Sequence, residues 1–165
     1  MEGMNGSRST PHIDDISHIT RREIQAPVAA CLINAYAEVL GREKAIEIAT
    51  DALREDAKKT GVKAAEAYGG NGMRELARYI REVWTKNDAL TINVLEFSDC
   101  CLRFDVTRCR YAELYERLGL RELGNCLSCC RDEPFAGGFN PRIRLTRKHT
   151  IMAGDKMCTF LFEME

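Results

Sequence analysis

The chain has 165 residues, 45% of them hydrophobic and 30% charged, and its formal net charge is -1 at pH 7. This is the length of one domain, and the near-neutral charge argues against a general nucleic-acid-binding protein, which carries a basic excess. No apolar run approaches the roughly 20 residues of a membrane span, so we expect a cytoplasmic protein with neither a membrane nor a nucleic-acid partner. Thiols stay reduced in that compartment, and the eight cysteines therefore indicate core packing, metal ligation or nucleophilic chemistry before disulfides.

The first half of the chain is predicted to be helical. Residues 1–12 are rich in Gly, Ser, Asn and Thr and predict a disordered N-terminal segment, followed by a single domain over residues 13–165 whose helical half ends at residue 86. Between residues 17 and 40, apolar residues recur at steps of three and four, which predicts one apolar helical face. The residues of this face are Ile24, Val28, Cys31, Leu32, Ala35, Tyr36 and Val39. Amphipathic N-terminal helices of this kind also favour a homo-oligomer that forms through them.

In the second half, residues 87–165, apolar residues recur at every second position, which is typical of strands. Apolar residues alternate over residues 90–97 and again over 102–106, and the residues between them predict a hairpin turn. The further elements that we predict are helices over residues 111–118 and 123–135 and a second hairpin with strands over 143–152 and 157–164. This order favours an α+β fold, in which the N-terminal helices pack on a mainly antiparallel sheet of about four strands and further helices are inserted between two hairpins.

Three cysteines stand close together in the predicted helix over residues 123–135. Cys126, Cys129 and Cys130 occupy positions i, i+3 and i+4, which lie on one face of a helix. Asp132 follows Cys129 by three residues, so this spacing predicts a thiol beside a carboxylate. The alternative is that the thiols are small core residues, a common place for free cysteine, and we favour it for Cys126 and Cys130.

The predicted strand over residues 143–152 carries two polar residues on its inner face. On that face, strict alternation places Ile143, Leu145, Arg147, His149 and Ile151. A buried arginine needs an anionic partner, and Asp132 or a substrate carboxylate would satisfy Arg147. Three alternatives stay open: a structural ion pair of Arg147 with Asp132 or Glu133, a partly buried His149 whose hydrogen bonds are satisfied within the protein, and a register shift by one residue that turns Arg147 and His149 outward.

The C-terminal part of the chain contains several short motifs that point to a known family. These motifs are Phe104 through Cys109, Tyr111-Ala112-Glu113, Leu118-Gly119, Glu122-Leu123, Cys129-x-x-Asp132, Phe139-Asn140-Pro141, Leu145-x-Arg147-x-x-Thr150, Gly154-Asp155 and Cys158-x-Phe160. Together they resemble the L-2-amino-thiazoline-4-carboxylic acid hydrolase family. The closing Gly-Asp-x-x-Cys-x-Phe is also similar to the end of 4-vinyl reductase-like small-molecule-binding domains.

The resemblance implies that the chain opens the 2-amino-thiazoline ring by hydrolysis to a carbamoyl-cysteine. It singles out Cys109, Cys129, Asp132, Arg147, Thr150 and Cys158. The matching segment departs from the family's pattern in its additional thiols, which are Cys100, Cys101, Cys126 and Cys130. The substrate could therefore differ from that of the family while the chemistry persists.

The proposed chemistry needs a nucleophile, a proton donor and a cationic anchor. We expect Cys129, with its pKa lowered by Arg147 or His149, to attack or polarise the ring, and Asp132 to activate water or protonate the ring. Arg147 would hold the substrate carboxylate, and Thr150 would donate to the tetrahedral intermediate. The remaining candidates are His149 as a further catalytic residue and Cys109, Asn140 and Cys158 as substrate-binding residues.

Two other kinds of site compete with a metal-free hydrolase. A Cys3His zinc site would use Cys109, Cys129, Cys158 and His149, but a second Cys-x-x-Cys pair is missing from the sequence, and we predict no cofactor. A non-catalytic small-molecule-binding or thiol-based sensing domain would instead use the three cysteines to line its pocket.

Overall fold

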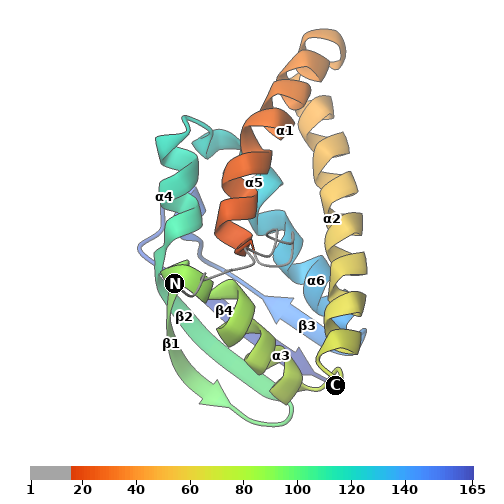
Figure 1. Ribbon diagram of the computed structural model, residues 1–165, viewed down its shortest axis with the longest axis vertical. Coiled ribbons are helices and arrows are strands. Elements are labelled where there is room, and N and C mark those ends of the chain that lie inside the picture. The colour runs from red at the N-terminus through yellow and green to blue at the C-terminus, as the bar shows by residue number, and fades with distance from the viewer. Residues whose placement is uncertain (1–15) are drawn as a thin grey trace, which may run out of the picture.

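The computed structural model describes residues 16–165, so the predicted N-terminal segment over residues 1–12 lies outside the described residues. Two long helices run antiparallel along one side of the molecule (Figure 1): α1 (His18–Leu40) and α2 (Arg42–Ala67). Ser17 caps the start of α1, because its hydroxyl accepts a hydrogen bond from a backbone nitrogen of the first turn at 3.3 Å. Gly41 separates the helices with a φ of 84°, which side chains disfavour, and so permits the tight turn.

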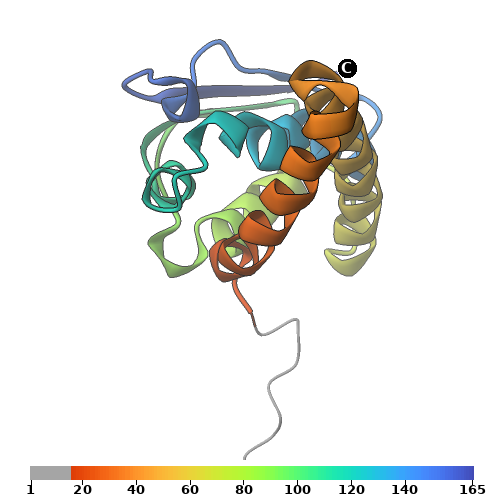
Figure 2. The same cartoon turned by 90° about the horizontal axis from the view of Figure 1, so that it is seen from above.

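The second half of the chain builds a four-stranded antiparallel sheet in the order β1-β2-β4-β3. Its strands are β1 (Leu90–Phe97), β2 (Cys101–Cys109), β3 (Ile143–Thr146) and β4 (Cys158–Met164). The shorter helices are α3 (Met73–Tyr79), which continues as a wider turn to Trp84, α4 (Arg110–Arg117), α5 (Gly124–Leu127) and α6 (Asp132–Phe139). The predicted α+β fold is confirmed, and Figure 2 shows the helices gathered on one side of the sheet.

Aromatic side chains fill the space between the sheet and the helices. Phe104 on β2 and Phe160 on β4 stack with their ring centroids 4.9 Å apart. Trp84 lies against Phe160 and Phe135, so it joins the sheet to α6. Each ring that is buried in this way contributes roughly 1.5–3 kcal/mol, which makes the cluster the main support of the sheet.

Two glycines let α2 and α6 approach one another closely. A methyl group at Gly61 of α2 would overlap the carbonyl of Phe135, and one at Gly138 of α6 would overlap the carbonyl of Lys58. The backbones therefore touch without intervening side chains, and no other residue fits these two positions without a shift of the helices. This contact fixes the direction of α6 and with it the position of Asp132, the first residue of that helix.

The predicted helix over residues 123–135 is wrong as one continuous element. It breaks at Ser128, whose φ and ψ of -128° and -67° are not helical, and a 3-10 turn over Cys129–Arg131 follows before α6. A side chain from another part of the chain satisfies a carbonyl of this turn: Arg147 donates a hydrogen bond to the Cys129 oxygen at 3.0 Å. The three clustered cysteines therefore do not share one helical face.

The predicted strand over residues 143–152 is also too long, because β3 ends at Thr146. Beyond it, the hydroxyl of Thr159 accepts from the backbone nitrogens of Lys148 and His149, both at 3.3 Å. The Thr159 hydroxyl oxygen takes the place of the backbone carbonyl that would pair with these nitrogens in a continued strand. The chain then forms a 3-10 turn over Ile151–Ala153 instead of continuing the sheet. Strict alternation therefore stops after β3.

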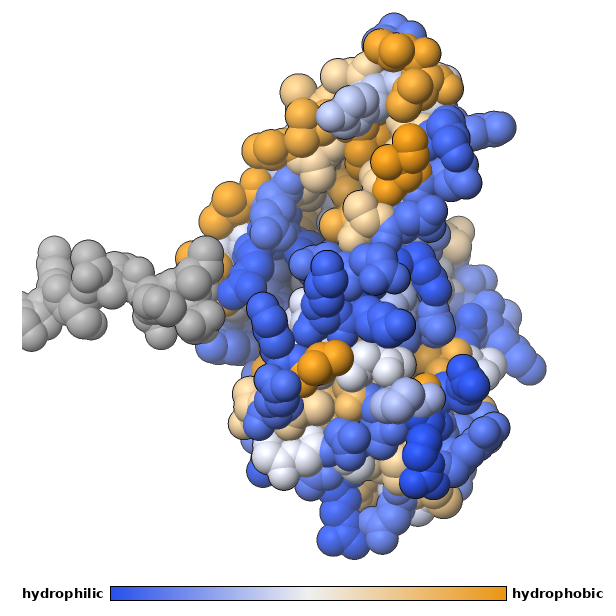
Figure 3. Space-filling view, turned by 90° about the vertical axis from the view of Figure 1, so that its right-hand side faces the viewer, coloured by the Kyte–Doolittle hydropathy of each residue, from blue (hydrophilic) through white to orange (hydrophobic). Residues whose placement is uncertain are grey.

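The apolar face predicted on α1 is largely exposed. Val28 is 63% exposed, Tyr36 58% and Val39 81%, whereas the buried side of α1 carries Ala26 and Ala30. Figure 3 shows apolar side chains gathered at the end of the molecule where α1 meets α2. Small residues let α1 pack closely on its neighbours, and this leaves the large apolar side chains facing outward. None of the helices within residues 16–165 is long and apolar enough to cross a membrane.

Candidate functional site

A cavity of about 100 Å³ lies between the sheet and the helices, beside the start of α6. At roughly 10–15 Å³ for each water-sized group, it has room for a ligand of up to about ten non-hydrogen atoms. Its polar lining includes Arg22, Cys109, Cys129, Asp132, Arg147 and Cys158. Its apolar lining includes Trp84, Leu90, Val106, Phe135 and Phe160. Five of the eight residues predicted for the site thus surround one cavity.

Asp132 and Arg147 form an ion pair at the cavity wall. Their side chains are 24% and 16% exposed, and the second terminal nitrogen of Arg147 donates to the Cys129 carbonyl. The guanidinium also lies over the Phe160 ring, 5.3 Å from its centroid. Burial raises the pKa of Asp132, while Arg147 acts in the opposite direction.

The prediction that a neighbouring cation lowers the pKa of Cys129 is wrong in its net direction. Burial and the negative charge of Asp132 raise the pKa of this thiol far above its usual range, and Arg147 offsets only part of the shift. His149 does not contribute, because it lies elsewhere. Cys129 is therefore a neutral thiol at pH 7 and a weak nucleophile in this state.

The two other cysteines of the cavity are neutral thiols as well. Burial raises the pKa of Cys109 to about 11, and burial also raises the pKa of Cys158. The sulfur of Cys158 accepts a hydrogen bond from the Ile151 nitrogen at 3.2 Å. These thiols form a polarizable, weakly polar part of the cavity wall. The charged groups of the cavity are its arginines and Asp132.

Three predicted site residues lie outside the cavity. His149 was expected to face inward with Arg147, but its side chain is 58% exposed and its Nδ1 lies 3.6 Å from Asp155. The hydroxyl of Thr150 accepts from the Ala153 nitrogen and so caps a 3-10 turn. Asn140 is buried, and its side chain bridges backbone groups of the loops next to α3 and β3. All three stabilise loops and do not reach the cavity.

The position of His149 also argues against the alternative of a Cys3His zinc site. Cys109, Cys129 and Cys158 line the cavity, whereas His149 points to Asp155 at the surface. Across residues 16–165, no group of three or more His, Cys, Asp and Glu side chains has the arrangement of a metal site. The donors that the sequence suggested are thus not assembled.

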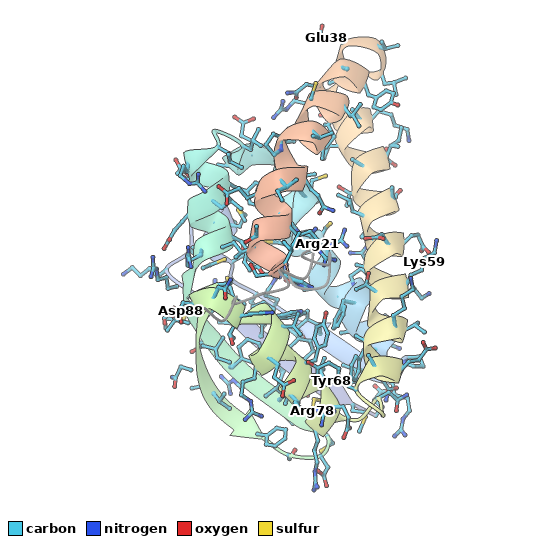
Figure 4. All side chains as sticks on the ribbon, viewed as in Figure 1. Arg21, Glu38, Lys59, Tyr68, Arg78 and Asp88 are labelled. Carbon is cyan, nitrogen blue, oxygen red and sulfur yellow. The ribbon has the colours of Figure 1, made fainter. Side chains whose placement is uncertain are left out.

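The start of α1 contributes residues that the sequence-based reasoning missed. His18 and Arg22 both line the cavity, and Figure 4 labels the neighbouring Arg21 at this end of α1, near the middle of the molecule. Burial lowers the pKa of His18 to about 4, with Arg22 acting in the same direction, so this imidazole is neutral at pH 7. One signal in the sequence could have pointed to this end of α1: helices prefer acids near their N-terminus, and α1 has none in its first turn.

Comparison with protein families gives one match that spans most of the chain. The model of the L-2-amino-thiazoline-4-carboxylic acid hydrolase family matches residues 21–162, a range that includes all eight residues predicted for the site. No curated protein matches the chain.

Two solved structures share the fold at low sequence identity. A trafficking protein particle complex subunit 3 from Naegleria fowleri, covalently bound to palmitic acid, has a TM-score of 0.51 at 12% identity over 88% of this chain and 95% of that chain. The phenol-responsive sensory domain of the transcription activator PoxR, with phenol, has a TM-score of 0.52 at 12% identity over 84% of this chain and 73% of that chain. At this identity the likeness concerns the fold alone.

Proposed function

The chain belongs to the L-2-amino-thiazoline-4-carboxylic acid hydrolase family, and we propose that it is a hydrolase that opens a small cyclic amidine or isothiourea ring. The observation that carries the proposal is the buried pair of Asp132 and Arg147 in a cavity of the right size. L-2-amino-thiazoline-4-carboxylate is the first substrate to test, and a carbamoyl-cysteine is its expected product.

Asp132 is the acid-base group of the proposed reaction. Its carboxylate takes a proton from a water molecule, and the water oxygen bonds to C2 of the ring. The carboxylic acid then gives this proton to the ring nitrogen, which receives the electron pair of its former double bond to C2. The regenerated carboxylate takes the remaining hydroxyl proton and delivers it to the ring heteroatom that leaves, as the bond from C2 to that atom breaks and the C2=O bond forms. One water is consumed and Asp132 ends in its starting state, so the step balances without a further reactant.

Arg147 positions Asp132 in this scheme. One of its terminal nitrogens pairs with Asp132 and the other with the Cys129 carbonyl, so both are engaged before a substrate arrives. Such a pair orients the carboxylate and stabilises its charged form between proton transfers. Cys129 serves as a neutral wall of the cavity, because its raised pKa argues against a thiolate nucleophile.

Mass spectrometry of the reaction tests the proposal. The wild type is expected to add one water to L-2-amino-thiazoline-4-carboxylate, and Asp132→Asn to lose about 100-fold or more of kcat, the range for removal of an acid-base group. Cys129→Ser is expected to keep turnover within about tenfold, because a hydroxyl can replace a neutral thiol. His149→Ala is the matched control, since that side chain lies outside the cavity.

These variants separate the possible outcomes. Full turnover by Asp132→Asn would refute the assigned chemistry. Loss of turnover in Cys129→Ser with retention in Asp132→Asn would restore the thiol as the nucleophile and overturn the water mechanism.

A second candidate is a non-catalytic small-molecule-binding domain. It is favoured by the neutral thiols and by the aromatic wall of Trp84, Phe135 and Phe160, which suit an apolar ring. The PoxR sensory domain, which has this fold, was solved with phenol. A wild type that is stabilised against heat by L-2-amino-thiazoline-4-carboxylate or phenol, but converts neither, would support this candidate.

A further inference from the structure

The charges around the cavity do not balance within the described residues. Three guanidinium groups line it, and two of them have carboxylate partners: Arg147 pairs with Asp132, and Arg131 pairs with Asp56. Among residues 16–165, the hydrogen-bond partner of the third, Arg22, is the neutral amide of Gln25, with Nη1 and Oε1 2.8 Å apart. One positive charge is therefore left without an anion.

The surroundings of Arg22 make this imbalance costly. Burial and the nearby charge of Arg131 lower the pKa of Arg22, which is the effect of a low-dielectric site that holds a second cation. Arg22 also lies near the N-terminal end of α1, where the helix dipole adds partial positive charge. A guanidinium cannot lose its proton in a protein, so a bound anion is what relieves the cost.

The tyrosines within electrostatic reach of Arg22 supply no anion either. Burial raises the pKa of Tyr115 to about 12 and also raises the pKa of Tyr111, so both phenols are neutral at pH 7.

We propose that Arg22 binds the carboxylate of a small monoanionic ligand in this cavity. The inference rests on the proposed function only in taking the cavity as the substrate site. It assigns the two ends of the ligand to different elements: α1 holds the carboxylate through Arg22, and the Asp132–Arg147 pair faces the ring. It also replaces the expectation that Arg147 anchors the carboxylate, because the terminal nitrogens of Arg147 are already engaged.

Binding of unreactive probes tests the assignment without turnover. We would measure the Kd of 2-aminothiazole-4-carboxylate and of 2-aminothiazole, which lacks the carboxylate, by calorimetry. The wild type is expected to prefer the carboxylate by about 10–100-fold, the worth of one charged hydrogen-bonded pair. Arg22→Met is expected to lose this preference, and Arg22→Lys to retain part of it. Arg108→Met, which breaks an exposed pair with Glu113, is the matched control.

The outcomes keep this inference apart from the hydrolase proposal. An equal Kd for both probes in the wild type, or an unchanged preference in Arg22→Met, would overturn the role of Arg22 even if turnover is intact. A carboxylate preference that depends on Arg22, in a protein that hydrolyses nothing, would support the anion site and refute the hydrolase. Should Arg22→Met fail to fold, the loss of preference in Arg22→Gln or its retention in Arg22→Lys decides the question.

The exposed apolar face of α1 supports a second, independent inference. From Ile24 to Leu40, Glu38 is the single charged residue of the helix. A helix that is apolar nearly all round is normally covered, and this one also borders an apolar groove of about 340 Å³ between α1 and α2. The large exposed side chains around the groove are Ile24, Val28, Leu32, Tyr36, Val39, Leu40 and Ile48.

The exposed apolar area matches what one subunit contributes to a dimer. These seven side chains are each 48–81% exposed, and they present roughly 600–800 Å², close to the roughly 800 Å² per partner of a standard interface. The face carries no Lys or Arg between Ile24 and Leu40, whereas helices that bind membrane surfaces are rich in them. In a two-fold symmetric dimer the same patch of both subunits meets, so the apolar face and groove of one subunit would contact those of its partner.

We infer that a second copy of this chain covers the α1–α2 face. Sedimentation of the full chain is expected to give a dimer at micromolar concentration, and Val28→Glu and Tyr36→Glu are each expected to give folded monomers. Val62→Glu is the matched control, because Val62 is 46% exposed on α2 outside the groove and should leave the dimer intact. A monomeric wild type would overturn the inference, whether or not it binds neutral phospholipid vesicles. Dimers that persist in both Val28→Glu and Tyr36→Glu would also overturn it.

Discussion

The Asp132–Arg147 pair makes a quantitative prediction for stability. Arg147→Met removes the charge and keeps much of the side-chain volume over Phe160, so the main effect is an unpaired carboxylate. The two side chains are 16% and 24% exposed, which places the pair among buried ion pairs. Breaking such a pair from one side costs about 3–5 kcal/mol, and the residual exposure favours the lower end, about 3 kcal/mol. For a domain of this size, that lowers Tm by roughly 6–12 °C.

Urea unfolding at pH 7 would measure the loss, with the midpoint and the slope fitted together so that a change in the unfolded state is recognised. The double variant Asp132→Leu with Arg147→Met should return to within about 1 kcal/mol of the wild type, because it leaves no buried charge. Arg108→Met breaks an exposed pair and should cost less than about 0.5 kcal/mol. A loss below about 1 kcal/mol in Arg147→Met, or a double variant no more stable than the single one, would show that the pair is open to solvent.

Three further predictions follow from the packing and from the titrating groups. Gly138→Ala should lose about 1–3 kcal/mol because its methyl overlaps the α2 backbone, whereas Gly137→Ala, with open space around it, should be neutral or stabilising by urea unfolding. The pKa of His18 is lowered to about 4, so stability should be full above the ordinary pKa of 6.5 and fall by up to about 3 kcal/mol as the pH drops toward 4, and His18→Gln should flatten this dependence. A thiol reagent at pH 7 should label exposed Cys100 at once and Cys129 only after denaturation; rapid labelling of Cys129 in the native state would contradict its raised pKa.

The fold was predictable wherever one face of an element is buried and the pattern is long. The alternation of Leu102, Phe104 and Val106 marks β2 correctly, because these residues face the helices and their neighbours face solvent. On α1 the same kind of periodicity marks a different surface: its large apolar residues face outward, and small ones such as Ala26 and Ala30 form the packed side. Periodicity shows that a helix has an apolar face, and it does not show which molecule covers that face.

The ion pair of the candidate site was predictable from the sequence, and much of the site's geometry was not. The pairing of Asp132 with Arg147 was one of the stated alternatives, because a buried guanidinium needs an anion. The roles of His149 and Thr150 assumed that β3 continues, but β3 ends at Thr146, and the backbone nitrogen of His149 donates to the Thr159 hydroxyl instead of to a ladder carbonyl. Arg22 lies far from the others in the sequence, and no local pattern brings the start of α1 to the start of α6.

The segments around the buried pair support the proposed acid-base role of Asp132. Asp132 begins α6 after the break at Ser128, and Arg147 follows the end of β3, so each charge lies at the end of a regular element. Arg147 joins the two segments by donating to both the Asp132 carboxylate and the Cys129 carbonyl. If the pair were purely structural, apolar residues could join the two segments at lower cost. A charged pair at the wall of a cavity, where a ligand can reach it, instead suits the proposed acid-base chemistry.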